Sequence, residues 1–196
     1  MKRAFDLGVA LGGLVVLSPL LAAAAGLVKL SSPGPAIYRG VRVGRDGRTF
    51  EMLKLRTMHL GADTQGPAVT SATDARITPV GRFLRRTKFD EVPQLVNVLR
   101  GEMSLVGPRP EHPEFVKHYS DAQRVVLSVR PGLTSPAALA YMREEETLVD
   151  GDPVDQYVTT IMPQKLALDL DYVRTATFAG DLKIIGRTLA RVIVRR

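Results

Sequence analysis

Cysteine and tryptophan are both absent from the 196 residues of this chain. Because cysteine is missing, the sequence excludes a disulfide scaffold, a cysteine nucleophile and a cysteine-ligated zinc site. A Walker A loop, a G-x-G-x-x-G fingerprint and an H-E-x-x-H helix are missing as well. The three histidines do not have the spacing of metal ligands: His59, His112 and His118. The length suggests one domain with a core of its own.

Acidic residues are fewer than basic ones, 20 against 27, and the formal charge is +7. A basic balance favours anionic partners such as nucleic acid, anionic lipid or phosphate-bearing substrates. Five basic side chains and no acidic one fall within residues 76–88: Arg76, Arg82, Arg85, Arg86 and Lys88. Such a run is either a binding surface or a solvated face, and both readings stay open. Nucleic acid is the weaker partner, because no aromatic stacking pattern accompanies the run.

Charge is missing altogether from residues 7–28, a run of 22 positions between Asp6 and Lys29. As a helix rising about 1.5 Å per residue, this run would reach roughly 33 Å, enough for a bilayer core of about 30 Å. Lys2 and Arg3 precede it and would keep that end on the cytoplasmic side. The run is therefore a candidate membrane segment.

Three interpretations compete for this segment. A cleaved signal peptide would have a basic start and a small-residue exit, but the apolar run is long for one. A kinked spanning helix is the second. The third is a re-entrant helix broken at Ser18 and Pro19, since proline removes a backbone hydrogen bond and clashes with the preceding turn. The physics of the segment does not separate the last two.

The remaining chain predicts a small β-hairpin followed mainly by helices. Residues 37–43 and 49–56 alternate in polarity around a Gly-Arg-Asp-Gly turn, which is typical of paired strands. Residues 59–75 are small and polar and predict a loop. Helical patterns cover residues 90–100, 112–128 and 162–176. In the first of these, Asp90 is expected to be the N-cap and Pro93 to lie in the first turn.

The C-terminal segment has the pattern of a basic amphipathic helix. Arg187, Arg191 and Arg195 recur every four residues along one helical face, and the apolar residues lie largely elsewhere. Such a helix suits a membrane surface. A terminal helix packed on the core, with a solvated basic side, explains the same pattern.

The stretch from Arg82 to Pro110 holds the densest chemistry. A basic cluster leads directly into Asp90-Glu91, and Arg109 lies between two prolines. Arginine binds phosphate oxygens with a planar fork. A carboxylate can hold Mg²⁺ beside substrate phosphates or attack phosphorus itself. A purely structural alternative is that Asp90 caps a helix and Glu91 pairs with a neighbouring base.

Several segments together resemble one known family, the bacterial sugar transferases or monotopic polyprenyl-phosphate phosphoglycosyl transferases. The resemblance covers nearly the whole chain and is that of the small form of the family. The segments that carry it are residues 2–6 (KRAFD), 17–20 (LSPL), 34–35 (GP), 54–58 (KLRTM), 90–95 (DEVPQL) and 97–110 (NVLRGEMSLVGPRP). The last run is very specific.

The resemblance implies a reaction and the residues that perform it. Asp90 would attack the β-phosphate of a UDP-sugar in the presence of Mg²⁺, and UMP would leave. The phosphate of undecaprenyl phosphate would then accept the phospho-sugar. Glu91 would act as a base or hold the metal together with Asp90, while Arg85, Arg109 and, as a weaker candidate, Lys54 would bind phosphates.

The resemblance also implies an architecture and a location. The fold would be α+β and mainly helical, with a re-entrant membrane helix over residues 1–32, a β-hairpin and amphipathic helices on the membrane surface. Residues 33–196 would form the catalytic domain, at the cytoplasmic face of the bacterial inner membrane, and a homodimer is left open. Ser18 and Pro19 match the helix break of the family.

One departure concerns the family pattern after residues 130–134 (RPGLT). Many members continue with Gly-Trp, whereas this chain has Ser135-Pro136. That region is expected near the nucleotide or sugar, so the sequence does not identify the sugar. A non-enzymatic module that binds the membrane surface is the alternative function, and release of UMP from a UDP-sugar would exclude it.

Overall fold

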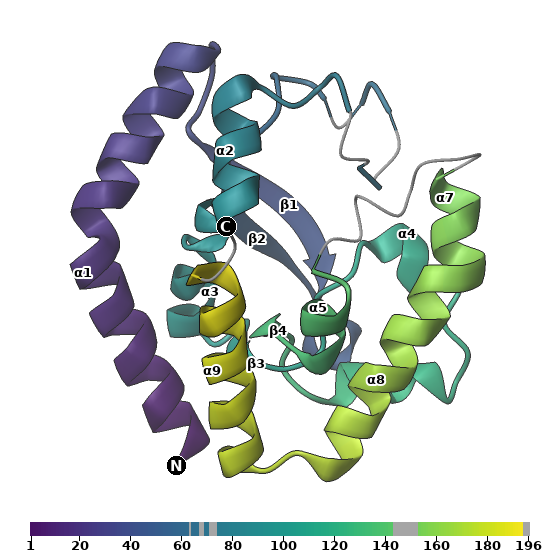
Figure 1. The fold of residues 1–196 in the computed structure, drawn as a ribbon. Helices are drawn as coiled ribbons and strands as arrows, with labels where there is room; N and C mark the ends of the chain where they lie inside the picture. Colours follow the sequence, from purple (N-terminus) through teal and green to yellow (C-terminus); the bar gives the residue numbers. More distant parts are fainter. Residues whose placement is uncertain (63, 67–68, 71–73, 143–152, 194–196) are drawn as a thin grey trace.

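A computed structural model describes the chain except for residues 63, 67–68, 71–73, 143–152 and 194–196. Its helices lie around two small two-stranded sheets (Figure 1). The first part contains α1 (Lys2–Ser31), β1 (Ile37–Val43), β2 (Thr49–Leu55), α2 (Pro79–Thr87), a 3₁₀ turn (Phe89–Glu91), α3 (Gln94–Arg100) and β3 (Ser104–Val106). The second part contains α4 (Pro113–Val116), a 3₁₀ segment (Gln123–Ser128), β4 (Gly132–Thr134), α5 (Pro136–Ala140), α7 (Pro153–Gln156), α8 (Met162–Thr175) and α9 (Phe178–Ile193).

The predicted hairpin is confirmed. β1 and β2 pair antiparallel, from Ile37 opposite Leu55 to Val43 opposite Thr49. The connecting residues Arg45–Gly47 form a 3₁₀ turn in which Asp46 and Gly47 adopt positive φ. A second sheet was not predicted: β3 and β4 pair in parallel and have three residues each. Such short strands carry too little alternation to be recognised from sequence.

The helix predictions need two corrections. Residues 112–128 do not form one helix, because the chain makes the four-residue α4 and, after a turn, a separate 3₁₀ segment. Residues 90–100 are also divided, into the 3₁₀ turn Phe89–Glu91 and α3. The third prediction is confirmed, since α8 covers Met162–Thr175. The loop predicted over residues 59–75 lies partly outside the described residues.

α1 is one continuous helix of 30 residues that contains Pro19. Its middle bends away from the body of the molecule, so both ends lean towards it (Figure 1). The Ser18 hydroxyl donates to the carbonyl of Val15 at 2.8 Å, one turn before, where a serine can take up bonding lost near a proline. The expected break is therefore a bend. α1 is long and apolar enough to cross a membrane, and only 11% of its most apolar window is buried against the protein.

Both ends of α1 are fixed to the rest of the chain. At its start, the buried carboxylate of Asp6 accepts from the Ser104 hydroxyl at 2.8 Å. At its end, the buried guanidinium of Arg56 donates to the carbonyls of Ser32 at 2.7 Å and Pro33 at 2.6 Å. Carbonyls at the end of a helix have no partner inside it, so a cation there stabilises them. α1 is thus part of the folded unit.

Candidate active site

The acidic pair lies on the short 3₁₀ turn between α2 and α3. Thr78 caps α2 by accepting from the Gly81 amide at 2.9 Å, and Lys88 ends that helix in the left-handed conformation (φ 56°). The reversal at Lys88 prevents α2 from continuing and starts the turn that carries Asp90 and Glu91. The pair is therefore placed by a helix end, whereas the sequence pattern indicated a helix start.

The prediction that Asp90 caps the following helix is wrong. α3 starts at Gln94, and its N-cap residue, Pro93, makes no side-chain capping bond. Asp90 is instead 5% exposed, and its Oδ1 atom has no hydrogen-bond partner among the described residues. The buried amide nitrogen of Gln94, one turn later, is also without a partner in that part of the chain. A buried polar atom without a partner is uncommon and points to a ligand or a reactive group.

The two neighbouring carboxylates have opposite electrostatic environments. Burial raises the pKa of Asp90 to about 6, although Lys54 opposes this effect. Burial would also raise the pKa of Glu91, but Arg109 and Lys54 outweigh it and hold that pKa well below its usual range. The surroundings of Asp90 therefore favour its protonated form, although a pKa of about 6 still leaves most of the group ionised at pH 7.

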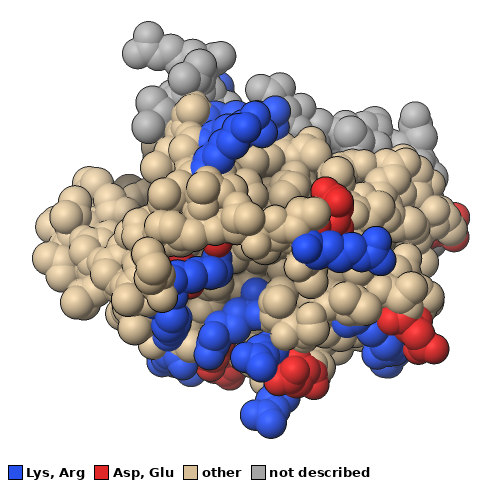
Figure 2. Space-filling view, turned by 90° about the horizontal axis from the view of Figure 1, so that it is seen from below, with Lys and Arg blue, Asp and Glu red and all other residues tan. Residues whose placement is uncertain are grey.

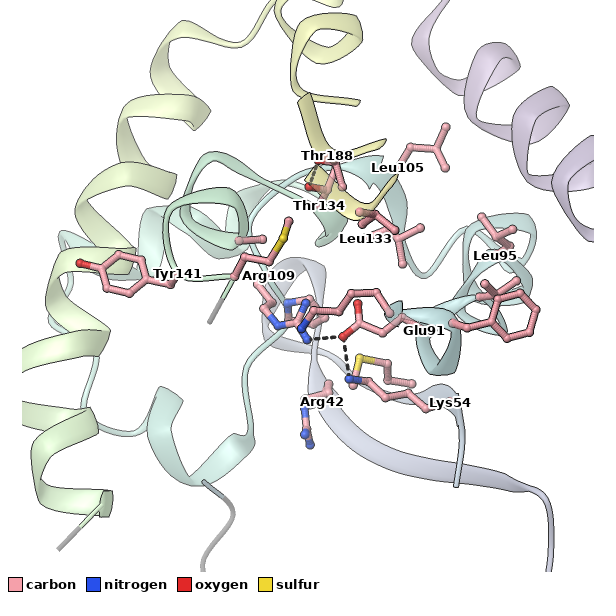
Figure 3. Close-up of a pocket in the computed structure, with 18 of the residues that line it drawn as sticks. Arg42, Lys54, Glu91, Leu95, Leu105, Arg109, Leu133, Thr134, Tyr141 and Thr188 are labelled. Atoms are coloured by element: carbon pink, nitrogen blue, oxygen red, sulfur yellow. Dashed lines mark hydrogen bonds and ion pairs between the residues drawn. The ribbon is translucent and has the colours of Figure 1, made fainter. Parts of the chain in front are cut away.

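Glu91 is the centre of a compact ion-pair cluster. Its Oε1 atom accepts from Lys54 Nζ at 3.1 Å and from Arg109 Nη2 at 2.8 Å, and its side chain is 13% exposed. Figure 3 shows Glu91 between these two cations, which come from β2 and from the segment after β3. The structure thus brings together three of the residues identified from the sequence.

Arg109 owes its position to a close approach of two backbone segments. The Gly107 amide donates to the Thr134 carbonyl at 3.0 Å, and the Gly132 amide donates to the Pro108 carbonyl at 2.8 Å. A Cβ atom on Gly107 would lie 2.4 Å from the Arg130 carbonyl oxygen, so only glycine fits there. Residues 107–110 are therefore held against β4.

A cavity of about 650 Å³ opens beside this cluster. Its charged end has five basic and two acidic lining residues: Arg42, Lys54, Lys88, Arg109, Lys165, Glu91 and Glu111. Its apolar end is formed by α1, α9 and the residues between them, including Val9, Gly13, Leu17, Leu95, Leu105, Leu133, Ile185, Leu189 and Val192. In Figure 3, Leu95, Leu105 and Leu133 lie on the α1 side of the ion-pair cluster. The cavity can thus accommodate a phosphate at one end and a long apolar chain at the other.

Two residues expected at the site do not line this cavity. Asp90 is buried and is not among the residues of the lining. Arg85, on the last turn of α2, donates through Nε to the Thr57 hydroxyl at 2.9 Å and is also outside the lining. Of the basic run that contains it, Arg82 and Arg86 are exposed.

Several polar residues at the cavity were not identified from the sequence. Arg42 projects from β1, and burial lowers its pKa. Glu111 accepts from the Tyr157 hydroxyl, and the same hydroxyl accepts from Lys165 Nζ at 3.2 Å. Asp169, which is not part of the lining, accepts from the backbone amide of the lining residue Arg109 at 3.2 Å. These residues come from distant parts of the chain, and none has a local motif that would signal a site.

Ser135 and Pro136, the departure from the family pattern, start α5. The Ser135 side chain caps this helix by accepting from the Ala138 amide at 2.9 Å, and Pro136 occupies its first turn. Ser135 is fully buried and also bonds Asp169, whose pKa burial raises to about 6. Thr134, the residue before Ser135, lines the cavity wall, and its hydroxyl lies 2.7 Å from the hydroxyl of Thr188 on α9. The departure therefore lies beside the cavity.

The expected Mg²⁺ has to be judged on the carboxylates present. No group of three or more acidic or histidine side chains that could hold a metal ion occurs among the described residues. Mg²⁺, however, commonly binds one or two carboxylates together with waters and substrate phosphates. Asp90 and Glu91, two neighbouring carboxylates on one turn, fit that smaller set.

A second, smaller cavity of about 470 Å³ lies at the end of the molecule where the N-terminus is found. Basic side chains gather around a hollow on that face (Figure 2). Its lining includes Arg3, which donates to the Val98 carbonyl at 2.8 Å, and Lys2, which pairs with Asp181. These basic groups satisfy a helix end and an acid, so the second cavity is chiefly structural.

The predicted basic helix at the C-terminus is confirmed as far as it is described. α9 ends at Ile193, and Arg195 lies outside the described residues. Arg187 is exposed, whereas Arg191 donates to the Leu139 carbonyl of α5. α9 therefore contributes an apolar wall to the cavity and also a tie to α5.

Comparison with known proteins identifies relatives over the whole chain. The family profile described as "Bacterial sugar transferase" matches residues 1–195. A UDP-glucose:undecaprenyl-phosphate glucose-1-phosphate transferase of Caulobacter vibrioides is 40% identical over 195 residues, which are 98% of this chain and 69% of that protein. The Escherichia coli protein of the same name is 36% identical over an alignment that covers 100% of this chain and 41% of that protein's length.

A third relative acts on a different sugar. The UDP-N-acetylgalactosamine-undecaprenyl-phosphate N-acetylgalactosaminephosphotransferase of Aeromonas hydrophila is 33% identical over 98% of this chain and 44% of its own length. The chain thus spans less than half the length of two of these relatives, and their sugars differ.

Proposed function

The chain belongs to the bacterial sugar transferase family, and on that premise we propose that it transfers a sugar-1-phosphate from a UDP-sugar to undecaprenyl phosphate. The observation that carries this proposal is the cavity, which joins a cationic end to an apolar end beside α1. A lipid phosphate has the same division into an anionic head and an apolar chain. A module that only binds membranes would not need a buried acidic pair at that position.

The proposed reaction has two displacements at one phosphorus atom. A carboxylate oxygen of Asp90 forms a bond to the β-phosphorus of the donor, while the bond from that phosphorus to the bridging oxygen breaks and UMP leaves with the electron pair. An oxygen of the lipid phosphate then attacks the same phosphorus, and the Asp90 oxygen departs as a carboxylate. No oxidant or reductant is needed, and the products are UMP and a lipid diphosphosugar.

The two carboxylates suit different roles in this scheme. Asp90 has an oxygen without a described partner, as a nucleophile requires, and its pKa of about 6 leaves it mostly ionised near pH 7. Glu91 is bound by two cations, and its lowered pKa makes it a poor base. We therefore assign Glu91 to positioning Lys54 and Arg109 for the phosphates, in place of the proton transfer considered from the resemblance.

Asp90 does not line the cavity, so the proposal requires a small movement that brings its carboxylate to the cavity. Phosphoryl transfer depends on close in-line placement of the attacking oxygen. Mg²⁺ held by Asp90 and Glu91 would supply positive charge to the diphosphate. The active site would lie at the cytoplasmic face of the inner membrane, where UDP-sugars are available. A homodimer stays a prediction.

Substitution of Asp90 tests the proposal directly. The full chain in lipid nanodiscs, with radiolabelled UDP-sugar alone, is expected to form a labelled enzyme that acid quench and peptide mass spectrometry place on Asp90. Asp90→Asn should leave no labelled enzyme and should lower the rate of UMP release by about 10³-fold or more. Glu91→Gln should slow turnover but still trap label, and Asp121→Asn, an exposed carboxylate, serves as the control.

The outcome also chooses between mechanisms. Label on Glu91, or full activity in Asp90→Asn, would show that the assignment is wrong. Product without any covalent species would favour a single displacement. If no UDP-sugar in a panel including UDP-glucose and UDP-N-acetylgalactosamine yields UMP with undecaprenyl phosphate, the proposed function itself fails.

A further inference from the structure

Gln94, the first residue of α3, is a buried polar residue without a role in the proposed reaction. It is 1% exposed, and its amide nitrogen, Nε2, has no hydrogen-bond partner in the described part of the chain. A buried donor without an acceptor is costly, so its presence needs an explanation. Four residues earlier, Oδ1 of Asp90 is a buried acceptor that also lacks a partner there. The two groups are complementary, because the amide nitrogen only donates and an ionised carboxylate only accepts.

Asp90 and Gln94 lie on the same side of an almost continuous helical backbone. The 3₁₀ turn that carries Asp90 continues into α3 through two residues with helical φ and ψ. Side chains four residues apart on such a backbone are neighbours on one face. Glu91 and Leu95, which have the same spacing, both line the cavity. Asp90 and Gln94 are both buried and outside its lining, so the two pairs occupy different faces.

A small rearrangement would bring these two groups together. No hydrogen bond joins them in the structure, but the glutamine side chain is long and can change its rotamer. The proposed reaction already requires the Asp90 carboxylate to turn one oxygen to the cavity. The other oxygen of the same carboxylate then stays directed into the protein, on the face that Asp90 shares with Gln94.

We infer that Gln94 is a positioning residue for the nucleophile, and that its Nε2 atom donates to the Asp90 oxygen that does not attack phosphorus. This assignment rests on the proposed function. It explains why a donor and an acceptor are both buried without partners on one face of this stretch, since they pair only when the carboxylate turns to the cavity. It also leaves Glu91 with the two cations that it already binds.

This hydrogen bond acts in both displacements. When one oxygen of Asp90 bonds the β-phosphorus and UMP leaves, the oxygen held by Gln94 becomes the carbonyl oxygen of an acyl phosphate. When the lipid phosphate attacks, the bond between phosphorus and Asp90 breaks and the electron pair returns to the carboxylate. A donor already in place fixes the direction of the first attack and stabilises the charge that returns in the second. Gln94 thus acts through Asp90 and needs no contact with the substrate.

Replacing the amide by an apolar side chain of similar length tests the inference. The full chain in lipid nanodiscs would be labelled with a radiolabelled UDP-sugar that the wild type turns over, and undecaprenyl phosphate would then be added. The rate at which label leaves the enzyme should fall about 10- to 100-fold in Gln94→Met, as expected for loss of one hydrogen bond to a charged group. The melting temperature should be unchanged or higher, because an amide without a partner in the resting protein contributes no stability. Gln65→Met, at an exposed position, is the control for both measurements.

The pH dependence of labelling separates positioning from a merely structural role. Four charged groups on β2, on the same turn and at the end of α2 act on Asp90 and remain in Gln94→Met: Lys54, Glu91, Lys88 and Arg85. Loss of a donor to the ionised carboxylate should therefore raise the pH of half-maximal labelling, at saturating UDP-sugar, by about one unit. An unchanged midpoint would mean that Gln94 only supports the fold, and would overturn the inference.

Two further results would overturn the inference. One is a Gln94→Met that loses its label at the wild-type rate, and the other is a parallel loss of UDP-sugar binding, both rates and melting temperature, as for a structural residue. If Gln94→Met does not fold, Gln94→Leu decides by the same measurements. Failure of the proposed function would instead appear as a wild type that releases no UMP from any UDP-sugar. An active, labelled wild type with an unchanged Gln94→Met would reject this inference alone.

Discussion

At the scale of single residues, two adjacent carboxylates have been given opposite properties by their neighbours. Asp90 is buried and has an oxygen without a described partner, whereas Glu91 is fixed by Lys54 and Arg109. Adjacent residues in a tight turn point in different directions, so one carboxylate reaches the cations and the other does not. This difference is a property of the contacts and not of the residue types.

The pH dependence of Asp90 follows from its burial. Its pKa in the folded protein, about 6, is above the value of about 4 for an unfolded carboxyl. If Asp90 is the nucleophile, labelling by UDP-sugar alone should slow about tenfold per pH unit below about pH 6. Stopped-time labelling between pH 4.5 and 8 would measure this, and a rate that is flat across pH 6 would contradict it.

The same pKa predicts the stability of a variant. A folded protein that holds a proton more tightly than the unfolded chain is less stable once that proton is lost. The melting temperature of Asp90→Asn at pH 7.5 should therefore be higher than that of the wild type, by about 2–4 °C for each kcal/mol gained in the free energy of unfolding. The difference should shrink as pH falls from about 6 to about 4. Because both proteins retain Asp169, their comparison isolates Asp90.

Arg109 and Arg85 differ in their contacts. Arg109 lines the cavity and bonds Glu91, whereas Arg85 bonds Thr57 outside the lining. Arg109→Lys should lower kcat/KM about 10²-fold or more, because a point charge cannot replace a planar fork. The resemblance assigned Arg85 to phosphate binding too, but it lies outside the lining, so Arg85→Lys should cause a smaller loss. Steady-state UMP release measures both, and near-normal activity of Arg109→Lys would remove it from the site.

At the scale of elements, α1 combines an exposed apolar surface with a bend. Leu11, Val15, Val16 and Leu20 are more than half exposed, which in water would be unfavourable and in lipid is not. Gly13 lets the helix approach α3, since a Cβ atom there would lie 3.2 Å from a methyl group of Leu95. One side of α1 therefore contacts protein and the other is available to lipid.

The disposition of α1 in the membrane can be tested by labelling. Ala4→Cys and Pro35→Cys are exposed positions before and after the apolar run, whereas Ser32, a natural choice from sequence, is buried. In this cysteine-free chain, an impermeant thiol reagent should reach both positions only from the cytoplasmic side. Pro19→Ala should move part of the population towards a spanning helix, since it restores a backbone donor. Labelling of the two positions from opposite sides would reject the re-entrant arrangement.

At the scale of the whole molecule, α1 is bonded to the remaining chain near both of its ends, and we expect the two to unfold as one unit. Asp6 and Arg56 connect the two ends of α1 to β3 and β2 through buried polar bonds. Asp6→Ala would leave the Ser104 hydroxyl without its acceptor, which should lower the free energy of unfolding by about 1–3 kcal/mol. The melting temperature in detergent should fall by about 2–4 °C for each kcal/mol, and exposed Asp121→Ala should not change it. An unchanged Asp6→Ala would mean that residues 33–196 are stable by themselves.

The amino-acid sequence by itself determined the elements whose signal is local. The uncharged run of residues 7–28 predicts the long α1, alternation predicts the β1–β2 pair, and periodicity predicts α8. Asp90, Glu91 and Arg109 were also identified, because they lie close together in a specific motif. In each case the evidence is contained within a few turns or one strand pair.

Only the tertiary structure decided how these parts meet. The left-handed Lys88 removed Asp90 from its expected helix cap, and the three-residue strands β3 and β4 placed Arg109 beside Glu91. Lys165 is separated from Lys54 by more than a hundred residues, and only folding brings both to one cavity. Burial and charge pairing depend on residues that are far apart in the sequence. Because they set the pKa values of the acidic pair, those values could not be predicted from any local sequence pattern.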